Sequence, residues 1–331
     1  MKPYILKMRP YLRPKVWGGR KLSTVFGKEL PADGPFGEAW EVSDLPEGQS
    51  TIVNGPLAGK SLLDACNLWG EVLTAGSADE RFPLLVKVLD AQDDLSVQVH
   101  PGEDDIARLG LDADSKDECW LILDADDDGC ILHGFDGATT PADFRMAVEE
   151  NRAADVLRRV NVQAGDIIRV TPGTIHAICK GVCLLEIQQP SDTTYRVYDY
   201  NRPGMDGNPR ELHLEDAMRV SNFDAHPPAK LDSRTSRAND AVDVLVDAEA
   251  YRIERVRPTM SMRWNVSDSG PQVVFAARGN VRLVADGVEV DLAFGETALL
   301  PAGLGGVSLD TDGGPCEVIV SGLGGEPLIA E

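Results

Sequence analysis

Apolar residues along this chain come in short runs that are separated by glycine, proline, aspartate and asparagine. The runs are rich in Val, Ile and Leu, which is typical of buried strands. The clearest examples are FPLLVKVL (82–89), CWLILDA (119–125), DIIRVT (166–171), VCLLEIQ (182–188), QVVFAARG (272–279) and VRLVADG (281–287). Many short strands joined by frequent turns predict an all-β sandwich or barrel. The stretch DADDDG (124–129) predicts the turn between two of these strands.

Helical patterns interrupt the strands. Residues 140–160 combine a Thr cap, an early proline and apolar residues at helical spacing, so they predict a helix. Shorter helices are predicted over residues 61–70 and 103–110. Residues 224–239 are polar and lack apolar periodicity, which predicts a linker.

An internal repeat indicates how the strands are organised. GDIIRVTPGTIH begins at Gly165 and GETALLPAGLGG begins at Gly295. Both contain a glycine, an acidic residue, a mostly apolar stretch and a turn with proline and glycine. At the last position the first copy has His176 and the second has Gly306. The repeat therefore predicts two barrels of one design, of which the first alone keeps a ligand.

Three segments carry residues that bind metals. LSVQVHP (95–101) places Ser96, Gln98 and His100 on one face of a predicted strand, because side chains alternate between the two faces. Glu118 lies at the start of another predicted strand, and His176 follows a Pro-Gly-Thr turn. Two imidazoles, a carboxylate and an amide oxygen form a mixed site that suits Zn²⁺, although Fe²⁺, Mn²⁺, Co²⁺ or Ni²⁺ would also fit. Each residue alone could equally be a packed or surface residue, so the prediction depends on their joint arrangement.

The charge of the chain limits its partners. A net charge of −22 argues against nucleic acid and anionic membranes, since both require a positive surface. Residues 1–28 are the exception, with eight Lys or Arg and no Asp or Glu. We interpret this segment as a solvated, proline-rich arm without a ligand, and the alternative is a local binding surface for an anion.

Other features of the composition indicate the compartment. No run of residues approaches the ~18–20 apolar residues of a membrane helix. The basic N-terminus lacks the apolar stretch and cleavage site of a secretory signal. The six cysteines are scattered and do not have the spacing of a disulfide framework. We therefore expect a protein of the reducing cytoplasm.

Several motifs together resemble the short bacterial type I mannose-6-phosphate isomerases. They are GEAWEVS (37–43), LSVQVHP (95–101), SKDECW (115–120), PGTIHAI (172–178) and SDTTYRVYDYNR (191–202), with WGG (17–19) and NGPLAGKSL (54–62) in support. The resemblance covers most of residues 10–220. It implies a mainly β protein of two cupin barrels, each a double-stranded β-helix, with a few short helices inserted in the first. The expected domains are a catalytic barrel over residues 1–235 and a barrel without metal over residues 236–331.

The resemblance also implies an activity and its residues. The family's zinc ligands fall on Gln98, His100, Glu118 and His176, and its catalytic arginine falls on Arg196. The implied enzyme holds one Zn²⁺ per chain and interconverts mannose 6-phosphate and fructose 6-phosphate through a cis-enediol. The sequence departs from the family pattern at Asp117, where a proline is usual, and at 171–173, where Thr-Pro-Gly replaces Pro-Ala-Gly.

Further residues are expected around this centre. Asp192 and Glu186 are potential bases or orienting groups, and Lys116 and Ser96 are potential contacts for phosphate or sugar. Trp17 and Trp40 could line the sugar site or pack in the core. Lys87 and Arg202 are weaker candidates, and Arg202 could instead form an ion pair with Asp199. The sequence leaves three alternatives open: a metal-containing cupin that binds or senses a sugar without turnover, an isomerase of a related sugar, and a monomer or a homodimer.

Overall fold

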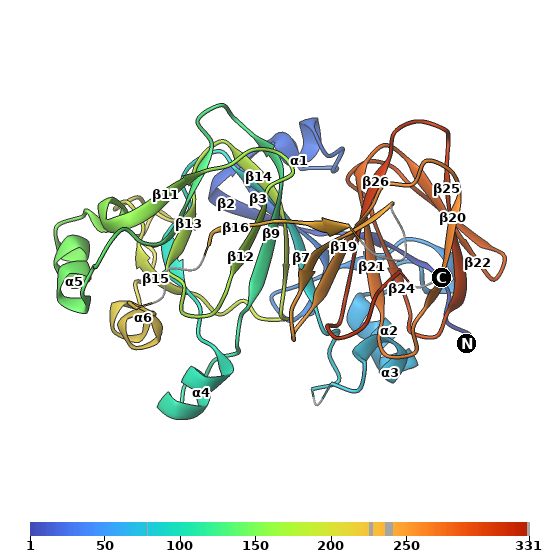
Figure 1. Ribbon diagram of the computed structural model, residues 1–331, viewed down its shortest axis with the longest axis horizontal. Helices are drawn as coiled ribbons and strands as arrows, with labels where there is room; N and C mark the ends of the chain where they lie inside the picture. The colour runs from blue at the N-terminus through green and yellow to red at the C-terminus, as the bar shows by residue number, and fades with distance from the viewer. Residues whose placement is uncertain (78, 225–227, 236–240, 330–331) are drawn as a thin grey trace.

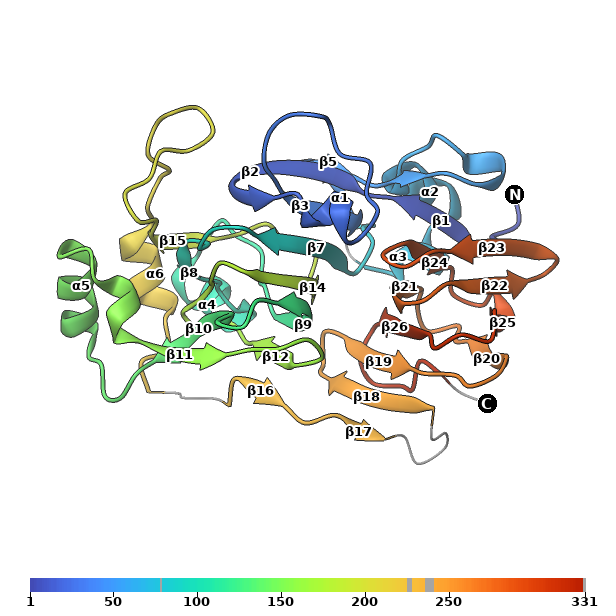
Figure 2. The same cartoon turned by 90° about the horizontal axis from the view of Figure 1, so that it is seen from above.

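The structure, a computed structural model, describes residues 1–77, 79–224, 228–235 and 241–329. It confirms the mainly β fold: two β barrels lie side by side, each built from two facing sheets (Figures 1 and 2). Helices α4 (Glu103–Leu109), α5 (Pro141–Glu149) and α6 (Leu214–Val220) lie at the outer end of the first barrel, and both termini lie at the opposite end of the molecule. Helices α2 (Leu62–Trp69) and α3 (Glu71–Thr74) lie beside the second barrel. Among the described residues, no helix has the length and apolar character that crossing a membrane would need.

The first barrel contains the strands predicted from the middle of the chain. One sheet has the order β11-β10-β13-β8-β15 and the other the order β16-β12-β9-β14-β7-β2-β3. Their bounds are β2 Tyr11–Gly19, β3 Phe36–Val42, β7 Leu85–Ala91, β8 Val97–Val99, β9 Glu118–Ala125, β10 Cys130–Phe135, β11 Leu157–Asn161, β12 Ile167–Val170, β13 His176–Ile178, β14 Val182–Gln188, β15 Tyr195–Tyr198 and β16 Lys230–Leu231.

The second barrel repeats this topology. Its sheets have the orders β17-β18-β19-β26-β21-β24-β1-β6 and β20-β25-β22-β23. The bounds are β1 Leu6–Arg9, β6 Thr51–Ile52, β17 Arg234–Thr235, β18 Val242–Asp247, β19 Arg252–Val256, β20 Met262–Val266, β21 Gln272–Arg278, β22 Val281–Ala285, β23 Val288–Leu292, β24 Thr297–Leu300, β25 Gly305–Thr311 and β26 Glu317–Gly322. The order β12-β9-β14-β7 thus corresponds to β24-β21-β26-β19, and β11-β10-β13-β8 corresponds to β23-β22-β25-β20.

The sequence repeat occupies the same place in both barrels. Its two copies run from β12 into β13 and from β24 into β25. Gly165 and Gly295 have φ angles of 92° and 84°, and Gly173 and Gly303 have φ angles of 80° and 65°. These values lie in the left-handed region that glycine adopts without steric cost. The shared turn geometry explains why the glycines are the recognisable part of the repeat.

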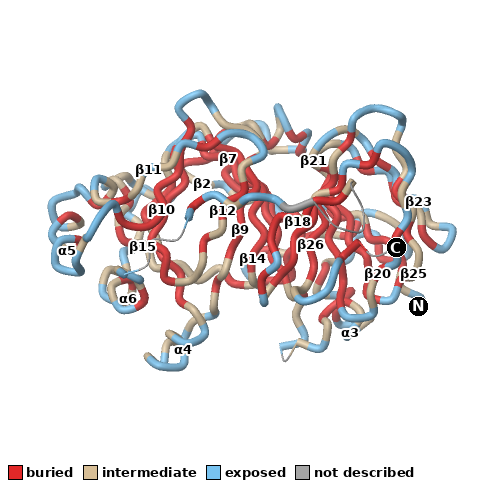
Figure 3. The backbone as a smooth tube through the Cα atoms, viewed as in Figure 1, coloured by how far each residue is buried: buried red, intermediate tan, exposed pale blue. Residues whose placement is uncertain are grey.

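The two barrels share an apolar core. Buried side chains of the larger sheet of each barrel meet between them, and Figure 3 shows the buried strands running continuously across the middle of the molecule. The contributors include Val86, Val88, Cys119, Leu121 and Leu185 from the first barrel and Tyr251, Ile253, Phe275, Leu299 and Ile319 from the second. Since successive residues of β9 face opposite sides, Trp120 and Ile122 pack instead inside the first barrel.

Two connections tie the barrels together along the chain. Strand β1, from the N-terminal part, pairs with β24, and β6 pairs with β1, so that both extend the sheet of the second barrel. Within the predicted linker, β16 pairs with β12 of the first barrel and β17 pairs with β18 of the second. Residues 225–227 and 236–240 of that linker lie outside the described residues. The division at residue 235 stays a prediction.

The helices follow the sequence signals with one exception. Helices α2 (Leu62–Trp69) and α4 (Glu103–Leu109) are confirmed, but the helix predicted over 140–160 is wrong beyond α5 (Pro141–Glu149). Thr140 caps α5 as expected, and Asn151 then adopts a φ of 59°, which ends the helix. The apolar residues farther on belong to β11, which pairs with β10. The remaining short elements are α1 Lys21–Thr24, β4 Asp44–Leu45, β5 Gly48–Gln49, η1 Gly55–Leu57, α3 Glu71–Thr74, η2 Ala153–Val156 and α6 Leu214–Val220.

Candidate metal centre

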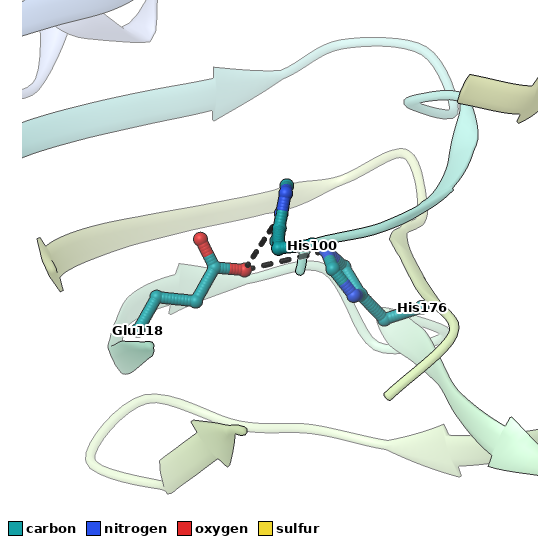
Figure 4. Close-up of side chains that lie close together, drawn as sticks. All are labelled: His100, Glu118 and His176. Carbon is teal, nitrogen blue, oxygen red and sulfur yellow. Dashed lines mark ion pairs between the residues drawn. The ribbon is translucent and has the colours of Figure 1, made fainter. Parts of the chain in front are cut away.

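Three buried side chains from different strands converge inside the first barrel. Glu118 Oε1 lies 3.6 Å from His100 Nε2 and 3.3 Å from His176 Nε2 (Figure 4). Glu118 begins β9, His176 begins β13 and His100 directly follows β8. A set of ligand atoms from the three residues lies within 4.8 Å of one another. The structure therefore brings together the three residues that the sequence grouped from separate motifs.

The far side of each imidazole is held by a backbone carbonyl. His100 Nδ1 lies 2.8 Å from Thr193 O, and His176 Nδ1 lies 2.9 Å from Thr174 O. A carbonyl oxygen can only accept, so we assign the proton of each ring to Nδ1. Burial lowers the pKa of both imidazoles to about 4, which leaves them neutral near pH 7. Each Nε2 thus presents a lone pair to the centre, as a metal ligand must.

The donor set fits a divalent metal. His100 Nε2 and Glu118 Oε1 are buried, and neither has a hydrogen-bond partner among the described residues. Burying such atoms without a partner costs about 1–3 kcal/mol each, more for a charged group. Lys116 Nζ lies 3.0 Å from the other oxygen, Oε2, and faces that side of the carboxylate. A cation between the imidazoles and Oε1 would satisfy the unpartnered atoms.

Gln98 lies at the edge of this cluster. It stands directly opposite His176 in the β8–β13 pair, and its Nε2 is 3.3 Å from His176 Nε2. The oxygen and nitrogen of an amide are exchanged by a half-turn of its last bond, which would direct Oε1 at the centre. Val97 and Val99, on the other face of β8, pack in the core under α5 and α6, as the alternation predicts.

A cavity of about 240 Å³ opens beside the centre. Its polar lining comprises Arg13, Lys15, Glu38, Lys87, Ser96, Gln98, Lys116, Glu186, Asp192, Thr194, Arg196, Arg210 and His213, with Trp17 among the apolar residues. Six of these are Lys or Arg and three are carboxylates, so the cavity is locally positive in a chain of net charge −22. A larger cavity, about 640 Å³, lies on the second barrel around β22 and β23, away from the His and Glu cluster. The cavity of about 240 Å³ is therefore the candidate substrate site, because it lies beside the His and Glu cluster.

Much of the cavity wall comes from the N-terminal segment. Arg13, Lys15 and Trp17 lie on β2, which pairs with β3 and β7, and all three line the cavity. The interpretation of residues 1–28 as a solvated arm is therefore wrong, and the alternative, a local binding surface for an anion, stays a prediction. The absence of any acidic residue in this segment was the available signal for its place at a positive cavity. Trp40 does not line the cavity: it is buried, and Arg13 Cζ lies 4.6 Å from its ring centroid.

Three ion pairs connect cations and carboxylates that both line the cavity. Lys15 Nζ lies 2.7 Å from Glu38 Oε1, Arg13 Nη1 2.8 Å from Asp192 Oδ2, and Lys87 Nζ 2.9 Å from Glu186 Oε1. Burial alone would raise the pKa of Asp192, but the positive charges of Lys87 and Arg13 hold it at about 2. Burial would lower the pKa of Lys87, but its carboxylate neighbours raise it, so both groups are charged near pH 7.

Arg196 differs from these cations. Its Nε donates to Ser96 Oγ at 3.3 Å and its Nη1 to Glu211 O at 3.0 Å, and no ion pair joins it to a carboxylate among the described residues. Burial and the neighbouring Arg210 lower its pKa, although an arginine stays charged near pH 7. Arg202, in contrast, pairs with Asp199 at 2.9 Å, as its surface interpretation expected. Arg196 is therefore the cation whose charge is available to an anion in the cavity.

Sequence reasoning missed several residues of the cavity wall, namely Arg13, Lys15, Glu38, Arg210 and His213. Glu38 stands inside the motif GEAWEVS, and Arg210 and His213 follow the motif SDTTYRVYDYNR closely, so proximity to recognised motifs was a usable signal. Arg13 and Lys15 are marked only by the lack of acidic residues in residues 1–28, which does not single them out. Their places depend on the pairing of β2 with strands far along the chain.

The second barrel has other residues at the positions that correspond to the candidate ligands. Gln98 faces His176 in the first barrel, and Asn265 faces Gly306 in the second. Glu118 pairs with Val170 of β12, and Gln272 pairs with Leu300 of β24. The Gln272 amide is satisfied internally, by Trp264 Nε1 at 3.0 Å and Leu328 O at 2.8 Å. In the second barrel the amide of Gln272 is thus hydrogen-bonded, whereas in the first barrel Glu118 Oε1, at the equivalent position, has no hydrogen-bond partner among the described residues.

Comparisons with known proteins give relatives over almost the full length of this chain. Residues 5–119 match the family model described as phosphomannose isomerase type I, catalytic domain. The chain is 37% identical over 325 residues to the probable mannose-6-phosphate isomerase GmuF of Bacillus subtilis strain 168, covering 96% of this chain and 98% of that protein. It is 34% identical over 330 residues to the mannose-6-phosphate isomerase ManA of the same organism, with coverage of 96% and 98%. The crystal structure of the mannose 6-phosphate isomerase from Bacillus subtilis is similar over 96% of this chain and 99% of that one, with a TM-score of 0.87 and 30% identity.

Proposed function

Since this chain belongs to the type I phosphomannose isomerase family, we propose that it interconverts mannose 6-phosphate and fructose 6-phosphate as a metal-dependent aldose–ketose isomerase. One observation carries the proposal: a buried cluster of His100, Glu118 and His176 lies beside a positive cavity. The cluster fits a divalent metal, and the cavity fits a small dianion such as a sugar phosphate.

The metal is one Zn²⁺ per chain, held by His100, Glu118 and His176, with Gln98 as the fourth ligand. Neutral imidazoles and a carboxylate are ligands that zinc prefers. When bound, the metal supplies a Lewis acid that polarises the sugar oxygens at C1 and C2. Lys116, whose ammonium faces Glu118 Oε2, is a contact for the phosphate or the sugar.

Asp192 is the proposed base for the transfer of hydrogen between C1 and C2. Its Oδ2 accepts from Arg13, and no hydrogen bond to its Oδ1 is found among the described residues. The carboxylate takes the proton from C2 of the open aldose, and the negative charge moves to the oxygen on C1. The hydroxyl proton on C2 then passes to that oxygen, which gives a cis-enediolate with its charge on the oxygen of C2. The carboxylate returns its proton to C1, and C2 becomes the ketone. Its positive neighbours Lys87, Arg13 and Lys15 outweigh the effect of burial and keep this carboxylate ionised near pH 7.

Arg196 and Glu186 have supporting roles in the proposal. The guanidinium of Arg196 stabilises the negative charge that develops on the enediolate oxygens, because it is always charged and has no carboxylate partner of its own. Both oxygens of Glu186 are occupied, by Lys87 Nζ at 2.9 Å and Trp120 Nε1 at 3.1 Å. Glu186 therefore orients Lys87 toward the cavity. Ser96 and Trp17 complete the contacts to the substrate.

The alternatives explain the structure less well. A cupin that binds or senses a sugar without turnover would not need charged groups on all sides of its metal. A related sugar as substrate would use the same cluster, and it is distinguished by assay. The six cysteines are free and buried, which supports a place in the reducing cytoplasm. The positive charge beside the His and Glu cluster lies in a small cavity, which supports a small-molecule substrate over nucleic acid or a membrane.

A coupled assay with mannose 6-phosphate tests the proposal. Purified protein should turn over this substrate, lose turnover in the presence of a chelator and regain it on addition of Zn²⁺. Mannose without phosphate and the 6-phosphates of other aldoses serve as comparison substrates. A zinc-loaded preparation that does not turn over mannose 6-phosphate would overturn the proposal, and faster turnover of another aldose phosphate would change the assigned substrate.

A further inference from the structure

Asp117 lies between two residues of the site. Lys116 and Glu118 face the centre, with Nζ 3.0 Å from Oε2. Asp117 points to the other side of the chain, because neighbouring residues of extended backbone face opposite ways. Its backbone is fixed by Gln189, whose Oε1 accepts from Asp117 N at 2.9 Å. The position of the Asp117 backbone therefore determines how the side chains of Lys116 and Glu118 are directed toward the centre.

The carboxylate of Asp117 is held by residues from both barrels. Arg169 of β12 donates from Nη2 to Oδ2 at 2.8 Å. Tyr251 of the second barrel donates its hydroxyl to Oδ1 at 2.5 Å. Charge-assisted hydrogen bonds of this kind are about twice as strong as bonds between neutral groups. The start of β9 is thus tied to a side chain that belongs to the other barrel.

Tyr251 is itself firmly placed. It has no exposed surface and belongs to the apolar core shared by the two barrels, with Cys119 and Leu121 of β9 in the same cluster. It directly precedes β19, and its carbonyl accepts from Ala248 N at 3.0 Å in the turn after β18. A ring packed in this way has little freedom to move, so its hydroxyl is a fixed point for Asp117.

We propose that Tyr251 is a positioning residue for the metal centre, acting from the second barrel through Asp117 on Lys116 and Glu118. This rests on the proposed function of that centre. A proline at position 117, the usual residue in the family that the sequence resembles, would restrict the backbone through its ring. Aspartate does not restrict its backbone in this way. The hydrogen bonds from Tyr251 and Arg169 to the Asp117 carboxylate restrict it instead. The barrel that has lost its own ligands therefore serves the barrel that keeps them.

The test compares Tyr251→Phe with a matched control, Tyr4→Phe. Tyr4 is also buried in the shared core, and its hydroxyl makes two hydrogen bonds, to Asn54 O at 3.2 Å and from Leu57 N at 2.9 Å, away from the site. Each variant is measured for Zn²⁺ affinity of the metal-free protein by competition with a chromophoric chelator. The values of kcat and KM at saturating Zn²⁺ and the unfolding midpoint are also measured.

Tyr251→Phe should weaken Zn²⁺ binding about threefold to tenfold and lower kcat by a similar factor with KM nearly unchanged. This is below the roughly 10–100-fold effect of losing a direct partner of a ligand, since Tyr251 acts through Asp117. Tyr4→Phe should lower the unfolding midpoint and leave Zn²⁺ affinity and kcat as in the wild type. Asp117→Ala should resemble Tyr251→Phe, and the double variant should be no worse than Asp117→Ala alone.

Two results would overturn the inference. One is wild-type Zn²⁺ affinity and kcat in Tyr251→Phe. The other is an equal loss of affinity in Tyr251→Phe and Tyr4→Phe, which would indicate general destabilisation. Failure of the proposed function gives a different result: a wild-type protein that binds Zn²⁺ without turnover, in which the affinities of the variants still test the positioning role.

Discussion

Gln98 faces His176 across the β8–β13 pair, with its amide nitrogen 3.3 Å from His176 Nε2. Because Nε2 is the unprotonated nitrogen of that ring, the amide donates to it. A metal bound to His176 Nε2 would occupy the lone pair that accepts this hydrogen bond. The amide of Gln98 would then turn so that Oε1 faces the metal. The orientation of the Gln98 amide thus depends on whether a metal is bound at His176 Nε2.

The first prediction concerns this amide. Gln98→Ala should weaken Zn²⁺ binding about tenfold or more, because a ligand oxygen is lost and no other residue replaces it. Chelator competition on the metal-free protein measures the affinity. Gln163→Ala, which removes an exposed amide from the turn before β12, is the control and should bind Zn²⁺ as the wild type does. Unchanged affinity in Gln98→Ala would show that Gln98 is not a ligand.

The second prediction concerns Arg196. Arg196→Ala should lower kcat about 10²–10³-fold, since a preorganised group that stabilises the developing oxyanion is removed. The zinc content should stay at the wild-type level, because Arg196 contacts Ser96 and the carbonyl of Glu211 but none of the three ligands. Arg145→Gln removes a surface arginine that pairs with Glu215 and serves as the control. Full turnover in Arg196→Ala would refute the assigned role.

The third prediction concerns pH and the Arg13–Asp192 pair. The pKa of Asp192 is about 2 in the folded protein and about 3.9 in an unfolded chain, so the ionised carboxylate stabilises the fold. This contribution is present in full above about pH 4 and is lost as the pH falls toward 2. Wild type and Asp192→Asn should therefore differ most in urea midpoint near pH 6, and the difference should shrink between pH 4 and 2.

This measurement is made on metal-free protein, so that release of zinc at low pH does not enter the comparison. The difference between the two proteins reports Asp192 together with Glu38, whose pKa the charge of Asp192 raises. In an Arg13→Gln background the difference at pH 6 should be smaller, because the ion pair at 2.8 Å is already absent. A difference that stays constant from pH 6 to pH 2 would contradict the prediction.

The sequence indicated the barrels and the metal cluster because both have local signals. Alternation in LSVQVHP places Gln98 and His100 on one face, and the repeated glycines mark equivalent turns. Arg13 and Lys15 could not be placed in this way. Arg13 meets Asp192 across 179 positions of sequence, and this contact depends on how β2 joins the barrel sheet. The overlong helix after residue 149 has a similar cause, since the pairing of β11 with β10 outweighs the local helical spacing.

The last prediction concerns the number of metal ions. We expect one Zn²⁺ per chain, because Gln272 and Gly306 stand in the second barrel where Glu118 and His176 stand in the first. The space beside Gly306 is also filled: a Cβ there would lie 2.5 Å from Arg263 Nη2. Metal analysis of the dialysed wild-type protein should give one equivalent. Glu118→Gln, which neutralises the carboxylate of the first barrel, should retain well under one equivalent. Two results would contradict the prediction that the second barrel binds no metal. One is a full equivalent of Zn²⁺ in Glu118→Gln, and the other is two equivalents of Zn²⁺ in the wild type.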